Sequence, residues 1–150
     1  MFKTRSPLDI LWDFVRKPKN VPVVQGPKIT RAEMEEILAS FNAQLWLSDN
    51  TFMLMDTNSL RTFLNVNPVD KRKYITEFSD CDDRCYELMG DVSTWHPAGA
   101  FGMVWGNRAT DGAGHAWNFF IDEFKKVRYV EPQEDRIFEP STEKIWVMII

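Results

Sequence analysis

The sequence has little cysteine, no long apolar run and no concentration of positive charge. Its two cysteines in 150 residues are too few for the disulfide framework that stabilises small secreted domains. The net charge is −4, and no segment is dense in lysine or arginine. We therefore expect no nucleic acid and no anionic membrane among its partners. The composition gives no signal for the oligomeric state.

The N-terminus is predicted to form a short helix rather than a signal peptide or a membrane span. Ser6 and Pro7 have the pattern of an N-cap followed by proline at the first helical position. Asp9 and Asp13 interrupt the apolar residues that follow, and secretory and membrane-spanning segments lack such charges. Synthesis inside the cell, in a reducing compartment, is the expectation.

The length and the hydrophobic content of 44% predict one domain over residues 1–150. Residues 1–43 would be its helical part and 44–150 its core. Residues 17–28 contain three prolines and a glycine, so they are expected to form an irregular connector. The fold class predicted is α+β, with helices first and a meandering antiparallel sheet after them. Helices are expected from residues 6, 30, 58 and 80, and strands over 44–49, 100–107, 115–122, 126–131 and 144–150.

Cys81 is expected in the first turn of a helix, where the helix dipole and free backbone N–H groups stabilise a thiolate. His115 begins a predicted strand, and Glu131 ends the next one. A nucleophilic sulfur needs a base and a group that orients that base. Cys81, His115 and Glu131 are therefore the candidate catalytic residues, in the order nucleophile, base and orienting carboxylate.

Three segments carry a family resemblance: DCDD (80–83), GHAWN (114–118) and VEPQ (130–133). Together they resemble the papain-like cysteine protease domain at the C-terminus of the Marasmius oreades agglutinin, and related small bacterial and phage proteins. The resemblance implies a papain-like, transglutaminase-like fold and a cysteine-dependent hydrolase of amide bonds, most simply a peptidase. It further implies a peptide or protein substrate, no organic cofactor, and a cytoplasmic or virion-associated location.

The aspartates around Cys81 suggest a metal ion. Unneutralised carboxylates oppose the ionisation of a neighbouring thiol, whereas a bound cation favours it. Oxygen ligands suit Ca²⁺ or Mn²⁺, and the resemblance implies calcium dependence. The first predicted ligands are Asp83 and Gln133, with Asp82 and Glu77 as further ones.

Other interpretations of these residues stay open. The domain would be a catalytically silent papain-like binding or virion-associated module if its triad were inactive. A zinc site would use Cys81 and Cys85 with His96 and His115, although Cys85 is more simply a core residue. The amide that would complete an oxyanion hole has three candidates in the sequence: Gln44, Asn50 and Asn58.

Overall fold

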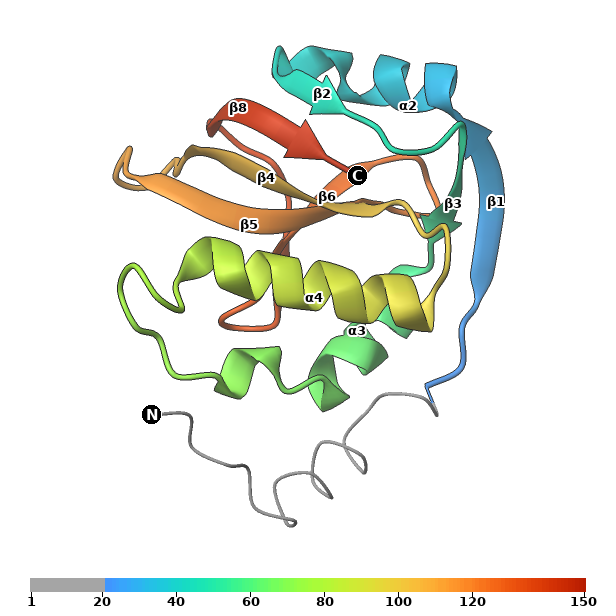
Figure 1. Ribbon diagram of the computed structural model, residues 1–150. Coiled ribbons are helices and arrows are strands. Elements are labelled where there is room, and N and C mark those ends of the chain that lie inside the picture. The colour runs from blue at the N-terminus through green and yellow to red at the C-terminus, as the bar shows by residue number, and fades with distance from the viewer. Residues whose placement is uncertain (1–20) are drawn as a thin grey trace.

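The computed structural model describes residues 21–150. They fold into three layers, with a six-stranded sheet between helices (Figure 1). Helix α2 (Arg31–Leu38) covers one face of the sheet, and α4 (Cys81–Trp95) runs along the other, next to α3 (Thr57–Val66). Two short 3-10 turns, Ala39–Phe41 and Val69–Lys71, follow α2 and α3.

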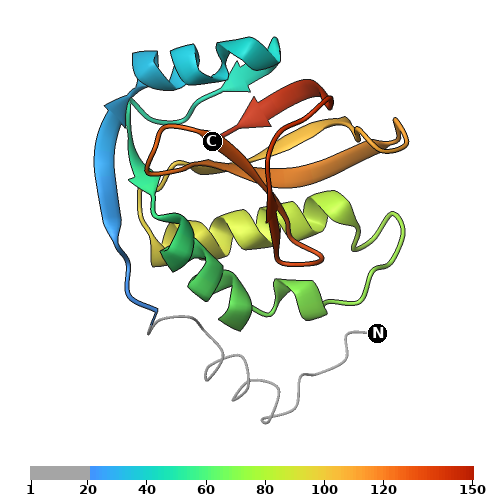
Figure 2. The same cartoon turned by 180° about the vertical axis from the view of Figure 1, so that it is seen from behind.

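The main sheet has the strand order β2-β8-β4-β5-β6-β7. Its neighbouring strands are antiparallel except β2 and β8, which are parallel. Two further strands, β1 and β3, form a separate antiparallel pair beside one end of this sheet (Figure 2). The strands are β1 (Gln25–Thr30), β2 (Gln44–Trp46), β3 (Thr51–Met55), β4 (Phe101–Asn107), β5 (Gly114–Ile121), β6 (Val127–Glu131), β7 (Arg136–Phe138) and β8 (Lys144–Ile149).

This architecture corrects the predicted fold class. The first part of the chain supplies three strands as well as helices, and the sheet is mixed rather than an antiparallel meander, because β8 returns between β2 and β4. Strand β1 lies largely within the segment predicted to be irregular. Its pairing with β3 shifts register between Gln25 and Lys28, around Gly26 and Pro27. Such an irregularity interrupts the alternation of apolar and polar residues by which a strand is predicted from sequence.

Side chains that accept hydrogen bonds from free backbone N–H groups define where the helices begin. Thr30 and Glu33 form the capping box predicted at the start of α2. Helix α3 is capped by Asp56, two residues before the predicted position, through a 2.7 Å bond from the Ser59 N–H. Asp80 is the N-cap of helix α4 and forms a capping box with Asp83. Cys81 therefore occupies the first helical position.

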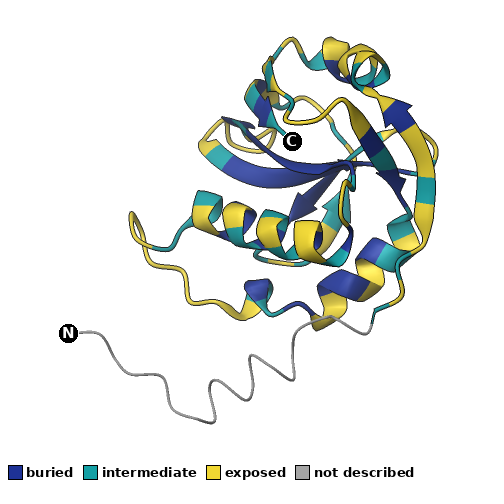
Figure 3. Ribbon diagram, turned by 45° about the vertical axis from the view of Figure 1, so that its right-hand side comes forward, coloured by how far each residue is buried: buried dark blue, intermediate teal, exposed yellow. Residues whose placement is uncertain are grey.

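Two apolar cores fill the spaces between the layers. On the α2 side, Met34 and Leu38 pack with sheet residues that include Trp117 and Phe119. On the other side, the core consists mainly of Leu60, Phe63, Leu88, Val92, Phe120 and Val130. Because consecutive strand residues alternate between faces, the central strands are buried on both sides, and exposed residues gather on the outer surfaces of the helices (Figure 3).

None of the helices within residues 21–150 is both long enough and apolar enough to cross a membrane. The helix predicted from Ser6 lies outside the described residues, so the expectations for the N-terminus and for the location of the protein stay predictions.

Gly90, in the exposed face of α4, offers a test of the packing. A Cβ atom there would meet nothing within 4 Å, and glycine in a helix interior is about 0.5–1 kcal/mol less favourable than alanine. Gly90→Ala should therefore raise the free energy of unfolding in urea by about that amount. Gly102→Ala is the contrasting variant, because its Cβ would lie 2.0 Å from the Ile149 carbonyl oxygen. A stabilising Gly102→Ala would contradict the packing of β4 against β8.

Candidate functional site

The N-terminus of α4 meets the beginning of β5 and the end of β6, and three chemically active side chains lie at this junction. Cys81 is the first residue of α4, His115 the second of β5, and Glu131 the last of β6. Asn118, fully buried in β5, holds the helix against the sheet: its Nδ2 donates to the Cys85 carbonyl at 3.1 Å and to the Gly102 carbonyl at 3.0 Å.

His115 and Glu131 form a direct pair. The distance between His115 Nε2 and Glu131 Oε2 is 2.8 Å, and each side chain is 11% exposed. The imidazole also stacks against Trp117, with ring centroids 5.8 Å apart. The hydrogen bond at Nε2 and the stacking contact with Trp117 fix the orientation of the imidazole, and Nδ1 stays available for another partner.

The half-buried thiol of Cys81 is the group whose ionisation is coupled to that of His115. Its interaction with His115 is the main cause that lowers the pKa of Cys81; burial opposes this shift, and a hydrogen bond from the Ala116 backbone reinforces it. Burial alone would lower the pKa of His115, but the interactions with Cys81 and Glu131 outweigh it and raise that pKa to about 9. Both shifts favour a thiolate next to an imidazolium near neutral pH.

The aspartates around the thiol are largely occupied with each other and with the helix end. Asp83 accepts a hydrogen bond from the Asp80 N–H at 3.2 Å. A hydrogen bond between the carboxyl groups of Asp80 and Asp82 raises the pKa of Asp82 and lowers that of Asp80. The charge of Asp80 is the smallest of the causes that act on the pKa of Cys81. The acidic surroundings therefore do not prevent the thiol from ionising.

The predicted calcium ligands are not gathered as a set. Among the described His, Cys, Asp and Glu residues, the group whose ligand atoms lie within 4.8 Å of one another is Asp80, Cys81 and Asp82. Of the predicted ligands it contains Asp82, but neither Asp83 nor Glu77. Gln133 lies next to the imidazole partner instead, since its backbone N–H donates to Glu131 Oε1 at 3.4 Å. Two adjacent carboxylates are a chemically suitable pair for Ca²⁺, and the metal site stays a prediction.

The zinc alternative is wrong, because its ligands lie far apart. Cys81 and His96 stand at opposite ends of the 15-residue helix α4, a separation of about 22 Å along its axis. Cys85 is completely buried against Met103 and Ala116, and burial raises the pKa of its thiol well above the usual value. As expected from the sequence, Cys85 is a core residue.

Of the three candidates for an oxyanion-hole amide, Gln44 lies on β2, three strands from β5 in the order β2-β8-β4-β5. This places it a lateral distance of about 14 Å from the strand that carries His115.

A cavity of about 220 Å³ adjoins the imidazole side of the site. His115, Trp117 and Glu131 contribute to its wall, and the β4–β5 hairpin and the β7–β8 segment enclose it. Arg108, Arg136, Phe138, Glu139 and Glu143 also line it. These five residues follow no motif and were not predicted from the sequence. The fold brings them to His115 from the β4–β5 loop, from β7 and from the segment between β7 and β8.

The fold has counterparts among solved structures. One is a complex of PSL1a with E64, with a TM-score of 0.73 and 19% identity over 82% of this chain and 51% of the other. Another is Polyporus squamosus lectin bound to the human-type influenza-binding epitope Neu5Aca2-6Galb1-4GlcNAc, with a TM-score of 0.69 and 20% identity over 82% of this chain and 49% of the other. No protein-family model and no curated protein matches the chain.

The shared feature is the fold. Since this chain spans about half the length of each matched lectin chain, the activities of the whole proteins do not transfer to it directly. The matches nevertheless correct the family assignment made from the three sequence motifs. The structural neighbours are lectins, so the prediction of a papain-like cysteine protease domain is wrong, as are the predictions of an amide-bond hydrolase and of a peptide or protein substrate.

Glu131→Gln tests the electrostatics of the site. Removing the carboxylate charge should lower the pKa of His115 from about 9 and raise that of Cys81, as NMR titration of the imidazole would show. The pKa of His115 in the folded protein, about 9, exceeds the ordinary histidine pKa of about 6.5. Its stabilising contribution is therefore complete below about pH 6.5 and is lost as the pH rises through about 9. The variant should lose that part of the pH dependence of unfolding. An unchanged His115 titration would contradict the coupling.

The calcium prediction is tested by titrating Ca²⁺ into the protein while its thermal midpoint is followed. Binding should raise the midpoint, because a ligand that binds only the folded state stabilises it. Asp82→Asn should remove the increase, whereas Glu35→Gln, which removes one exposed charge from α2, should not. A midpoint that does not respond to Ca²⁺ at millimolar concentration would exclude the site.

Proposed function

We propose that this domain is a binding module that captures an electrophilic ligand through the thiol of Cys81. His115 keeps the thiol ionised, and Glu131 holds His115 in position. The proposal is supported above all by the 2.8 Å contact between His115 and Glu131 beside a thiol of lowered pKa. A buried cysteine without these partners has a raised thiol pKa instead, as Cys85 illustrates in the same helix.

The chemistry needs only groups that belong to this site and to the ligand. The Cys81 thiolate attacks an electrophilic carbon, so that an S–C bond forms and the bond from that carbon to a heteroatom breaks. The heteroatom takes the electron pair of the broken bond and accepts the proton from the His115 imidazolium. Glu131 stabilises the imidazolium before this transfer and orients the neutral ring after it. The product is a covalent adduct on sulfur.

The cavity beside His115 is a natural place for the rest of the ligand. It lies next to the group that releases the proton and contains about 220 Å³. Its rim carries both arginine and glutamate side chains, so that it offers hydrogen-bond donors and acceptors without a strong preference for one sign of charge. One structural neighbour is a complex with E64, which makes E64 a rational first ligand to incubate with this protein.

Alkylation by iodoacetamide tests the proposal. Cys81 should react at neutral pH, and its rate should depend on pH with a midpoint below that of an ordinary thiol, whose pKa is about 8.5. His115→Ala should slow the reaction at pH 7, because it removes the main cause that lowers the pKa of Cys81. Mass spectrometry of tryptic peptides separates labelling at Cys81 from labelling at Cys85.

Cys85→Ser is the matched control, because it removes the buried thiol and should leave the labelling rate of Cys81 unchanged. Equal, slow labelling of both cysteines, or a rate that is unaffected by His115→Ala, would overturn the proposal.

Carbohydrate binding is the second candidate function. It is favoured by one observation, namely that a structural neighbour is a lectin bound to the epitope Neu5Aca2-6Galb1-4GlcNAc. Isothermal titration of the same trisaccharide into this protein would support the candidate if heat of binding saturates at one equivalent. Absence of binding at millimolar trisaccharide would exclude this carbohydrate as a ligand. That result would not bear on the proposal for Cys81, which is tested separately by alkylation.

A further inference from the structure

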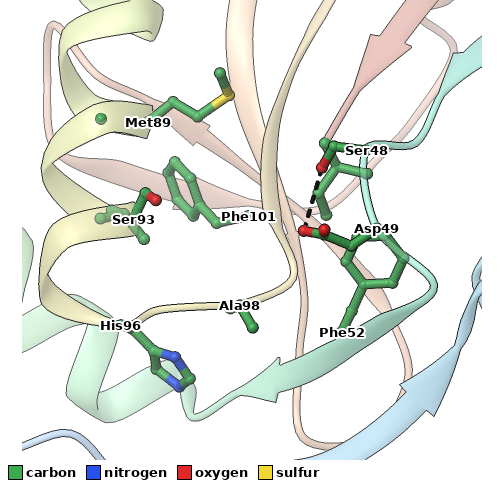
Figure 4. A pocket seen from close by; sticks show the side chains of 12 residues that line it. Ser48, Asp49, Phe52, Met89, Ser93, His96, Ala98 and Phe101 are labelled. Atoms are coloured by element: carbon green, nitrogen blue, oxygen red, sulfur yellow. Dashed lines mark hydrogen bonds between the residues drawn. The ribbon is translucent and has the colours of Figure 1, made fainter.

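A second cavity, of about 300 Å³, lies beside the C-terminal half of α4. Met89 and Ser93 of the helix face Ser48 and Asp49 of the β2–β3 loop across it (Figure 4). This volume corresponds to a small organic ligand. Ser93 is twelve residues from Cys81 along α4, or about 18 Å, so the cavity is separate from the thiol site.

Asp49 brings a carboxylate to this cavity. It is the single acidic side chain among the lining residues, which also include the imidazole of His96, and it forms no ion pair with any lysine or arginine of residues 21–150. Its one hydrogen bond to a described residue is the 3.3 Å bond that its Oδ2 accepts from Ser48 Oγ. The carboxylate points across the cavity toward α4 (Figure 4). An uncompensated carboxylate in a concave site attracts a cation.

Part of the remaining wall is apolar and polarisable. Phe52 and Phe101 are almost completely buried but line the cavity, together with the thioether of Met89. Aromatic rings attract cations as well as apolar groups. An inorganic divalent cation would need more oxygen ligands than Asp49 and the two serines offer, and a neutral apolar molecule would gain nothing from Asp49.

We propose that this cavity binds a small organic amine, whose ammonium group pairs with Asp49 and whose apolar body lies against Phe52 and Phe101. Ser48 and Ser93 supply further oxygen atoms that can accept its N–H groups. The proposal is independent of the reactivity of Cys81, because no residue of the thiol site lines this cavity.

Benzylamine is a suitable probe, with benzyl alcohol as its neutral counterpart of similar shape. Titration followed by amide NMR shifts should show saturable binding of benzylamine, with perturbed signals at the lining residues, and weaker binding of benzyl alcohol. Asp49→Asn should weaken the binding of benzylamine by about two- to fivefold, the scale of an ion pair with an exposed carboxylate. Glu35→Gln removes an exposed acidic charge elsewhere and should leave the affinity unchanged.

Gly90→Leu provides a second, steric test. Gly90 lines the cavity, and a Cβ atom there meets nothing within 4 Å, so the larger side chain should fill the space without disturbing the helix. This variant should not lower the thermal midpoint, because leucine is a better helix former than glycine, and it should lose benzylamine binding. Cys81→Ser should keep benzylamine binding. Equal affinity for benzyl alcohol, or benzylamine binding that is unchanged in Asp49→Asn and Gly90→Leu, would overturn the proposal.

Discussion

The contact between His115 and Glu131 is the interaction on which the chemistry of this molecule depends. A buried imidazole ordinarily loses its proton more easily than an exposed one, and burial does act in that direction here. The carboxylate 2.8 Å away, together with the neighbouring thiol, reverses the effect and keeps the ring protonated. The thiolate of Cys81 then has a cation beside it, despite the aspartates that precede and follow it in the sequence.

The rest of the fold keeps these three residues together. Asn118, two positions after Ala116 on the same face of β5, binds the backbone of α4 and so sets where the helix lies on the sheet. The capping box of Asp80 and Asp83 begins that helix one residue before the sulfur. The carboxylates of Asp80 and Asp83 would by themselves disfavour a neighbouring thiolate, but as capping groups they stabilise the N-terminus of the helix that carries Cys81.

The junction of α4 with β5 and β6 was predictable from the sequence because it depends on local signals: a cap before Cys81, glycine before His115 and a β-branched run before Glu131. The mixed sheet was not, since the parallel pairing of β2 with β8 joins residues about a hundred positions apart and leaves no periodic pattern. The papain-like assignment failed for a related reason: three short motifs describe one junction, whereas the structural match involves the whole layered arrangement. Asp49 and Phe101 carried no motif at all, and only the folded chain brings them to one cavity.

Absorbance of the thiolate near 240 nm, followed over pH in the intact protein and in Cys81→Ser, tests the central claim most directly. The difference between the two proteins reports the ionisation of one sulfur atom. The account predicts that the thiolate forms at a lower pH than in an ordinary cysteine, whose pKa is about 8.5, and that this difference disappears when the His115 side chain is removed. A difference signal that arises only at or above that pH would contradict it.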